Sequence, residues 1–112
     1  TDSIYNYTQN HKTTREMVKI GVAYGSDVDL VTKLLLEVVA EEKLLLNSPK
    51  PFVQFDDFGD SALLFSIHFY IKDSFNAPGL KSKVRYGIDA KFRKHNISIP
   101  FPQRDIHVIS KS

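Results

Sequence analysis

The stretch VKIGVAYGSDVD, residues 18–29, organises the rest of the chain, because it predicts a strand that turns directly into a helix. Its first half alternates, and Val18, Ile20, Val22 and Tyr24 share one face, as in a strand with one buried side. The opposite face carries a glycine and an alanine, so it leaves room for a neighbouring segment to approach closely. We therefore expect a first strand over residues 17–24 that buries its apolar face.

The second half of the stretch predicts a capped helix. Gly25 permits a tight turn, and Ser26 followed by Asp29 fits a capping box at a helix N-terminus. An anion bound at this N-terminus is the weaker alternative, because acidic residues occupy the place where the anion would lie. Apolar spacing continues to the leucines at 44–46, so we expect the helix to end at the prolines and polar residues of 47–51.

The remainder of the chain predicts a hairpin, a second helix and a last strand. Residues 52–58 and 61–71 alternate on either side of a two-residue Gly-Asp turn. A core stripe repeats every four residues along the second helix, which Asn96 ends in a left-handed conformation. Residues 104–109 alternate once more as a last strand.

The order β-α-β-β-α-β predicts an α+β fold of the ferredoxin-like type. In that sandwich two helices cover one face of a four-stranded, mostly antiparallel sheet, with the first and third strands central. We expect residues 17–112 to form this domain. Residues 1–16 are polar and are expected to be an extended lead-in, the tail of a preceding β domain.

Composition excludes several classes of protein. The 112 residues suit one domain, and 42% hydrophobic with 25% charged residues is ordinary for a globular protein. The absence of cysteine excludes a disulfide scaffold and thiol catalysis. A net charge of +2 gives no electrostatic reason to expect nucleic acid as a partner. No apolar run approaches the ~20 residues that span a bilayer, so we expect this piece to be soluble.

Candidate chemical sites are weak. Asp56, Asp57 and Asp60 crowd one hairpin end, but their spacing does not fit a calcium loop, so solvated turn acids are the better interpretation. His68 and His107 could share the outer sheet face and leave a minor metal or pH-sensor option. No nucleophile–base pair is evident, so we predict neither an enzyme nor a cofactor or metal site.

The stretch IPFPQRD, residues 99–105, is the least ordinary part of the chain. Two prolines exclude a helix and hold Phe101 in a stiff, extended connector. A large apolar side chain in such a place packs either on its own domain or on another subunit, and the residues alone leave both alternatives open.

Three motifs together resemble the C-terminal cytoplasmic domain of the small-conductance mechanosensitive channel (MscS-like) family. They are VAYGSD at residues 22–27, FGDS at 58–61 and IPFPQRD at 99–105. Their order and approximate spacing match the family, and the resemblance runs over about residues 15–109. The membrane helices and the Gly/Ala-rich pore helix of the family are absent, so we expect this chain to be an excised soluble piece of a longer channel.

The resemblance implies a part in a homo-oligomeric ring, seven-fold in the family, that closes a vestibule below the pore. Openings in the vestibule wall filter ions and osmolytes, and the parent channel is embedded in the cell inner membrane with this domain on the cytoplasmic side. The implied subunit-interface residues are Pro100, Phe101, Pro102, Gln103 and Arg104. Ile106 and Val108 are implied to lie in or near an axial strand. The family's domain has no enzymatic activity and needs no cofactor.

Two other functions remain as alternatives. A stand-alone ferredoxin-like module could bind RNA or a small ligand on its outer sheet face, where His68 and Tyr70 are expected. The aromatic and basic pattern of RNA-recognition domains is missing from the third strand, which makes this the runner-up. An acylphosphatase-like enzyme would need an anion site that the sequence does not provide.

Overall fold

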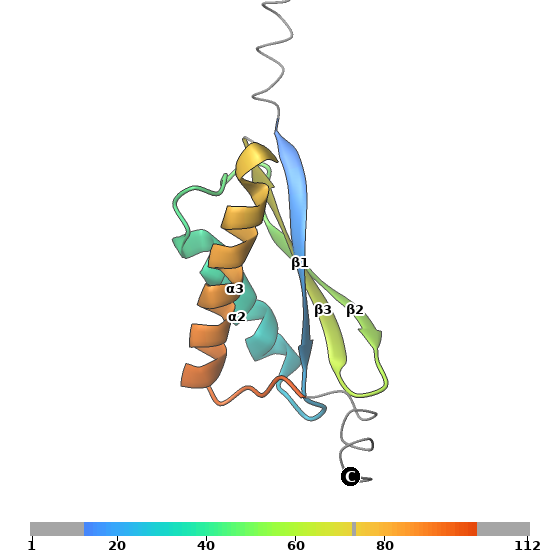
Figure 1. Ribbon diagram of the computed structural model, residues 1–112. Coiled ribbons are helices and arrows are strands. Elements are labelled where there is room, and N and C mark those ends of the chain that lie inside the picture. Colours follow the sequence, from blue (N-terminus) through green and yellow to red (C-terminus); the bar gives the residue numbers. More distant parts are fainter. Residues whose placement is uncertain (1–12, 73, 101–112) are drawn as a thin grey trace, which may run out of the picture.

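The computed structural model describes residues 13–72 and 74–100. Both helices lie on one side of an antiparallel sheet, so the molecule has two layers (Figure 1). In chain order the elements are β1 (Thr14–Val22), α2 (Val28–Glu41), β2 (Phe52–Phe58), β3 (Leu63–Ile71), the 3-10 turn η1 (Ser74–Asn76) and α3 (Ala77–Lys94). The predicted α+β class is confirmed, with both helices on one face as expected.

The sheet has the order β1-β3-β2, and both pairings are antiparallel. β3 is the central strand, and β1 lies beside it as the sequence predicts. The other edge of β1 has no strand partner among the described residues. The predicted last strand at 104–109 lies outside the described residues, so a fourth strand and the full ferredoxin-like topology stay predictions.

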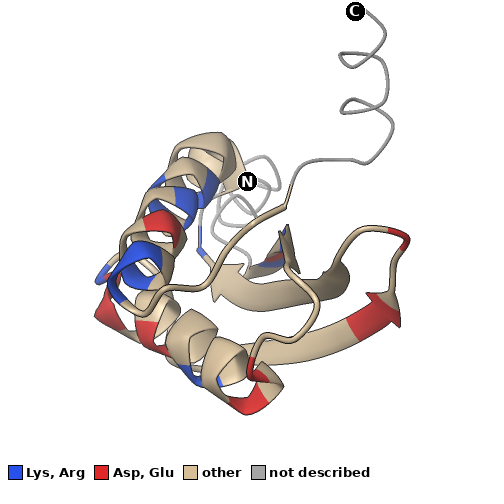
Figure 2. Ribbon diagram, turned by 90° about the horizontal axis from the view of Figure 1, so that it is seen from below, with Lys and Arg blue, Asp and Glu red and all other residues tan. Residues whose placement is uncertain are grey.

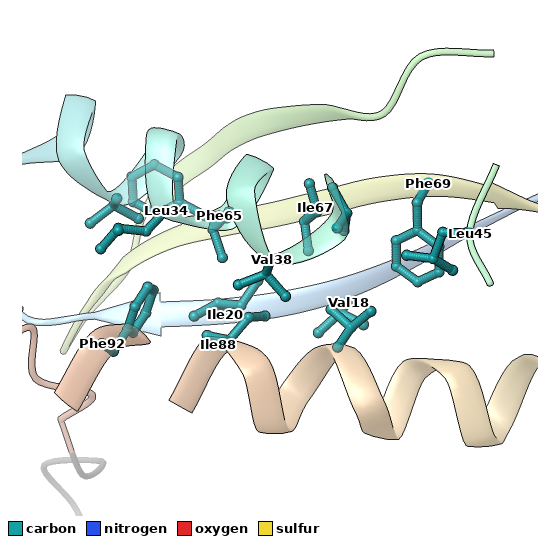
Figure 3. Packing of buried hydrophobic residues seen from close by; sticks show 14 of the residues in the cluster. Val18, Ile20, Leu34, Val38, Leu45, Phe65, Ile67, Phe69, Ile88 and Phe92 are labelled. Atoms are coloured by element: carbon teal, nitrogen blue, oxygen red, sulfur yellow. The ribbon is translucent and has the colours of Figure 1, made fainter. Parts of the chain in front are cut away.

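The core lies between the sheet and the helices. Every second residue of β3 points toward the helices and is buried, because the strand has a period of two. Ser66 and His68 on the outer face are buried as well. Each helix supplies one apolar stripe, as its sequence spacing predicts (Figure 3). The largest side chains that are fully buried include Phe65, Phe69, Phe92, Leu34 and Leu35.

The bounds of β1 and α2 differ from the prediction. β1 runs over Thr14–Val22 rather than residues 17–24, because its first residues pair with the end of β3, where Thr14 lies opposite Ile71. Tyr24 lies beyond the strand and is 52% exposed, so its predicted place on the buried face is wrong. α2 ends at Glu41, before the leucine run. Leu45 turns into the core, and the Leu46 N–H donates to the Tyr70 carbonyl at 3.0 Å, so tertiary contacts to β3 replace further helical turns.

The β2–β3 hairpin is wider than predicted. Four residues rather than two connect the strands, and the Gly59 N–H donates to the Ala62 carbonyl at 2.8 Å. A Cβ at Gly59 would lie 2.9 Å from that carbonyl oxygen, so the connection requires glycine. Ala62 also fills the small face of β1, since a Cβ at Gly21 would lie 3.2 Å from the Ala62 Cβ. The chain's own hairpin therefore occupies the room that the sequence suggested for a close neighbour.

The two helices meet at a close contact flanked by charges. Gly87 of α3 faces Val38 of α2, and a Cβ at Gly87 would lie 2.9 Å from the Val38 Cγ1. Beside this contact, Lys91 of α3 pairs with Glu41 at 3.0 Å and Glu37 at 3.4 Å, both on α2. Its hydrogen bond to Glu41 contributes most to raising the pKa of Lys91. The pair is solvent-exposed, so close packing at the glycine, more than charge, sets the distance between the helices.

Candidate functional site

The three sequence motifs meet at one end of the domain. The Tyr24 hydroxyl, from the first motif, donates to the carbonyl of Gly59 in the second. The Ala23 N–H donates to the carbonyl of Ser98, the residue before the third motif, at 2.9 Å. Figure 1 shows the end of β1, the β2–β3 hairpin and the segment after α3 gathered at its lower end. Three stretches that are up to 75 residues apart in the chain, from 24 to 99, therefore form one structural unit.

The turn of the first motif is held by its own side chains. Gly25 has φ +93°, a left-handed conformation that favours glycine. The Ser26 hydroxyl donates to the Ala23 carbonyl at 2.6 Å, so Ser26 is not the helix cap that the sequence predicts. Asp27 caps α2 instead, and its Oδ1 accepts from the N–H groups of Asp29 at 3.0 Å and Leu30 at 3.2 Å. The free N–H groups are thus satisfied by a carboxylate, which leaves the anion-site alternative without support.

Replacing this cap gives a simple test of the turn. We expect Asp27→Ala to lower the free energy of unfolding by about 1 kcal/mol, because two N–H groups lose their acceptor. Asp29→Ala is the matched control, since it removes an acidic residue from the same helical turn and leaves the cap in place. Chemical denaturation measures both. Equal losses in the two variants would show that charge near the helix end, and not the cap, carries the effect.

The end of α3 launches the third motif in a fixed direction. Asn96 has φ 60°, the left-handed conformation that the sequence predicts. The Ile97 N–H donates to the Phe92 carbonyl at 2.8 Å and the Asn96 N–H to the Arg93 carbonyl at 3.3 Å, which is a Schellman ending. Ile97 packs against the core, while the Ile99 side chain is exposed. The chain therefore reaches Pro100 from a rigid anchor at the edge of β1.

Exposed aromatic side chains accompany the hairpin at this end. Phe55 and Phe58, both on β2, have ring centroids 5.0 Å apart, and Phe55 stacks on the buried ring of Phe65 at 4.7 Å. Phe58 is 68% exposed and Tyr24 is 52% exposed. Neither Phe55 nor Phe58 was predicted from the sequence as a site residue. Their presence on a short strand beside three acids was the signal that could have identified them.

Two acids of the hairpin accept hydrogen bonds from groups of the same chain. Asp56 accepts from the Ser66 hydroxyl at 3.2 Å, and Asp57 Oδ1 accepts from the Phe58 N–H at 2.8 Å. Over residues 13–72 and 74–100, no group of three acidic or histidine side chains is arranged to hold a metal ion. Turn acids remain the better interpretation.

The outer sheet face holds a short polar network beside a groove of about 460 Å³. The Ser66 hydroxyl donates to Asp56 at 3.2 Å, and its oxygen lies 2.9 Å from His68 Nε2. Phe52 covers His68 at 4.6 Å with nearly parallel rings, so neither ring offers a free face for stacking a base there.

His68 predicts a pH dependence of stability. Burial lowers the pKa of His68 and the charge of Arg15 lowers it further, while Asp56 opposes both. The folded state then binds fewer protons than the unfolded state once the pH falls below the ordinary histidine pKa of about 6.5. We expect the free energy of unfolding to be flat above that pH, as far as this group is concerned, and to decrease as the pH falls below it.

Denaturant titrations between about pH 5 and about pH 8 measure this effect, with His68→Gln as the comparison. The glutamine amide can still donate to Ser66 but does not titrate in this range. The slope between about pH 5 and 6.5 should be smaller in the variant. An identical slope in both proteins would assign the pH dependence to other groups.

The structure places little of the predicted interface. Pro100 is described and half-buried, at the point where the chain leaves its anchor. Phe101, Pro102, Gln103 and Arg104 lie outside the described residues, as do Ile106, Val108 and His107. Their roles stay predictions.

Comparison with known proteins decides the family. Residues 17–99 match the family model described as "Mechanosensitive ion channel MscS, C-terminal". The chain belongs to the MscS family. The matched segment runs from within β1 to just beyond α3 and contains two of the three motifs, with the first residue of the third.

Relatives of the MscS domain extend over almost the whole chain. An MscS-family protein of Haemophilus influenzae is 33% identical over 96% of this chain, and the mechanosensitive channel MscK of Escherichia coli is 32% identical over 96%. The chain spans only 10% of the length of each of these two relatives. The crystal structure of Helicobacter pylori MscS in its closed state matches with a TM-score of 0.74 at 29% identity, covering 80% of this chain and 35% of that one. In the described part of this MscS domain, neither helix has the length and apolar character needed to cross a bilayer.

Proposed function

We propose that this chain forms part of the oligomeric vestibule of a mechanosensitive ion channel, below the pore on the cytoplasmic side of the cell inner membrane. The vestibule wall filters ions and osmolytes before they reach the pore. The observation that carries the proposal is the match of residues 17–99 to the MscS C-terminal domain. The relatives named above are channels or MscS-family proteins, which agrees with a role without enzymatic activity.

The proposal assigns a place to each segment. Residues 1–16 are the tail of a preceding β domain, and residues 17–112 form the vestibule domain of a seven-membered ring of identical subunits. The connector, residues 100–104, lies at the boundary between neighbouring subunits, and Ile106 with Val108 lies in or near an axial strand. The anchor of the connector supports this assignment, because Ser98 and the Schellman turn hold the start of the connector rigidly at one edge of the sheet.

The outer sheet face supports a structural role better than RNA binding. His68 is only 6% exposed and lies beneath the Phe52 ring. Met17 of β1 lies opposite His68 in the sheet. An RNA-recognition surface needs aromatic rings that are open to bases on the central strands. The runner-up function therefore gains no support from this face.

A domain exchange tests the proposal. Residues 17–99 replace the matching segment of Helicobacter pylori MscS, and a version that lacks the segment altogether is the control. We expect the exchanged channel to open under membrane tension and to keep a solute selectivity, measured by reversal potential and osmolyte efflux, that the deleted version loses. Equal selectivity in the exchanged and deleted channels would contradict the filtering role.

A further inference from the structure

The end of the domain where the motifs meet carries a patch that combines aromatic rings with acids. We define the aromatic–acidic patch as Tyr24, Phe55, Asp57, Phe58 and Asp60. Phe55 stacks on Phe65, a ring that is 1% exposed, and the Phe58 ring contacts Phe55 at a tilt of 58°, so the two exposed phenylalanines are supported from the core. An apolar surface that is both rigid and open to solvent is suited to a partner.

The charge of the patch is uncompensated. Residues 51–71 contain three aspartates and neither lysine nor arginine. The ion pairs in the described part of the chain involve neither Asp57 nor Asp60. Figure 2, which views this end of the molecule, shows acidic residues on the hairpin and basic residues mainly on the helices. A suitable partner therefore presents an apolar side chain together with a cation.

The connector of the same chain has this chemistry. Residues 100–104 read PFPQR, so an aromatic ring fixed between two prolines precedes an arginine by three positions. In an extended polyproline-like segment this spacing is about 9 Å, and the arginine side chain adds further reach. Phe101 can then contact the phenylalanines of the patch while Arg104 pairs with an aspartate.

The connector and the β2 residues of the patch belong to opposite edges of the sheet. The connector starts at Ser98, which is bonded to Ala23 just beyond β1, whereas Phe55, Asp57 and Phe58 lie on β2, the other edge strand. Two strand spacings, about 10 Å, separate these edges. Two different surfaces of one molecule that complement each other can join copies head to tail, and such contacts form a ring when the rotation between copies closes.

The prolines also discourage the connector from continuing along its own β1. Continued pairing along the edge of β1 would need N–H groups from the connector, and two of its five residues, Pro100 and Pro102, have none.

We propose that the connector of one subunit docks on the aromatic–acidic patch of the next, with Phe101 against Phe55 and Phe58 and Arg104 paired with Asp57 or Asp60. This inference rests on the proposed function, since it names the contact that closes the ring. Of the two alternatives for Phe101, it proposes packing on another subunit.

The lack of cysteine in the chain makes a direct test possible. Gln103→Cys is labelled with a nitroxide and mixed with an unlabelled, ¹⁵N-enriched copy of the 112-residue chain. We expect the amide signals of Phe58, Gly59 and Asp60 in the enriched copy to broaden. Lys72→Cys, at the opposite end of β3, is the control position for the label and should leave these signals sharp.

Charge variants make the test specific. Asp60→Lys in the enriched copy should remove most of the broadening, and Arg104→Glu in the labelled copy should restore it through the reversed pair. Asp89→Lys makes the same charge change on α3, away from the patch, and should have no effect. Broadening that occurs only when label and isotope share one chain would overturn the proposal in favour of self-docking. Absence of broadening in every mixture would overturn it as well. Either result leaves the domain-exchange test of the vestibule unaffected, so the two failures are distinguishable.

Discussion

Phe65→Ala is expected to lower the free energy of unfolding by about 3–5 kcal/mol. The Phe65 ring is 1% exposed at the centre of β3, packs in the core beneath α2 and stacks on Phe55 at 4.7 Å (Figure 3). Truncation removes apolar area from the core and leaves a cavity that the strands on either side cannot close. It also removes the ring that supports the aromatic–acidic patch.

Phe58→Ala is the matched control for this loss. It deletes the same side chain from the same hairpin, but from a position that is 68% exposed. We expect a change of at most about 0.5 kcal/mol in the free energy of unfolding, measured by chemical denaturation. A loss for Phe58→Ala as large as that for Phe65→Ala would mean that Phe58 is a core residue and is unavailable to a partner.

Gly87→Leu is expected to destabilise the domain by about 2–3 kcal/mol, although leucine is the better helix former. The new Cβ alone would lie 2.9 Å from the Val38 Cγ1, and valine has little rotamer freedom in a helix. The two helices must therefore move apart. Gly79→Leu is the control on the same helix, because nothing lies within 4 Å of a Cβ there, and it should be neutral or stabilising.

A double-mutant cycle isolates the contact between the helices. Val38→Ala removes the methyl groups that the new side chain meets, so the Gly87→Leu, Val38→Ala double variant should recover about 1–2 kcal/mol relative to the sum of the single changes. Denaturation of all four proteins supplies the coupling energy. Simple additivity would show that the destabilisation has another origin.

The sequence predicted the layers well because one periodicity governed each element. The alternation of β3 and the four-residue stripe of α3 directed Phe65, Phe69, Ile88 and Phe92 inward, and all are buried. Boundaries failed where a tertiary contact decided them. The leucine run is compatible with further turns of α2, but burial of Leu45 in the core stabilises the chain more than those turns would.

The candidate site was only partly predictable. The motifs indicated which residues matter, but the contact from Tyr24 to Gly59 joins segments 35 residues apart and has no local signal. The cap lies one residue later than predicted. The Ser26 hydroxyl donates to the Ala23 carbonyl, and Asp27 accepts from the N–H groups at the start of α2. Such competition between neighbouring acceptors depends on turn geometry that the sequence does not specify.

The measurement that tests the central claim most directly is the mass of the intact parent channel, extracted in detergent and examined by native mass spectrometry. The proposed head-to-tail contact between the connector and the aromatic–acidic patch predicts a closed assembly of more than two copies, and the proposed seven-membered vestibule predicts that it holds seven. Asp60→Lys in the parent should shift that population toward smaller species, and Asp89→Lys should not. A parent channel that is a monomer or a two-fold dimer would contradict the account.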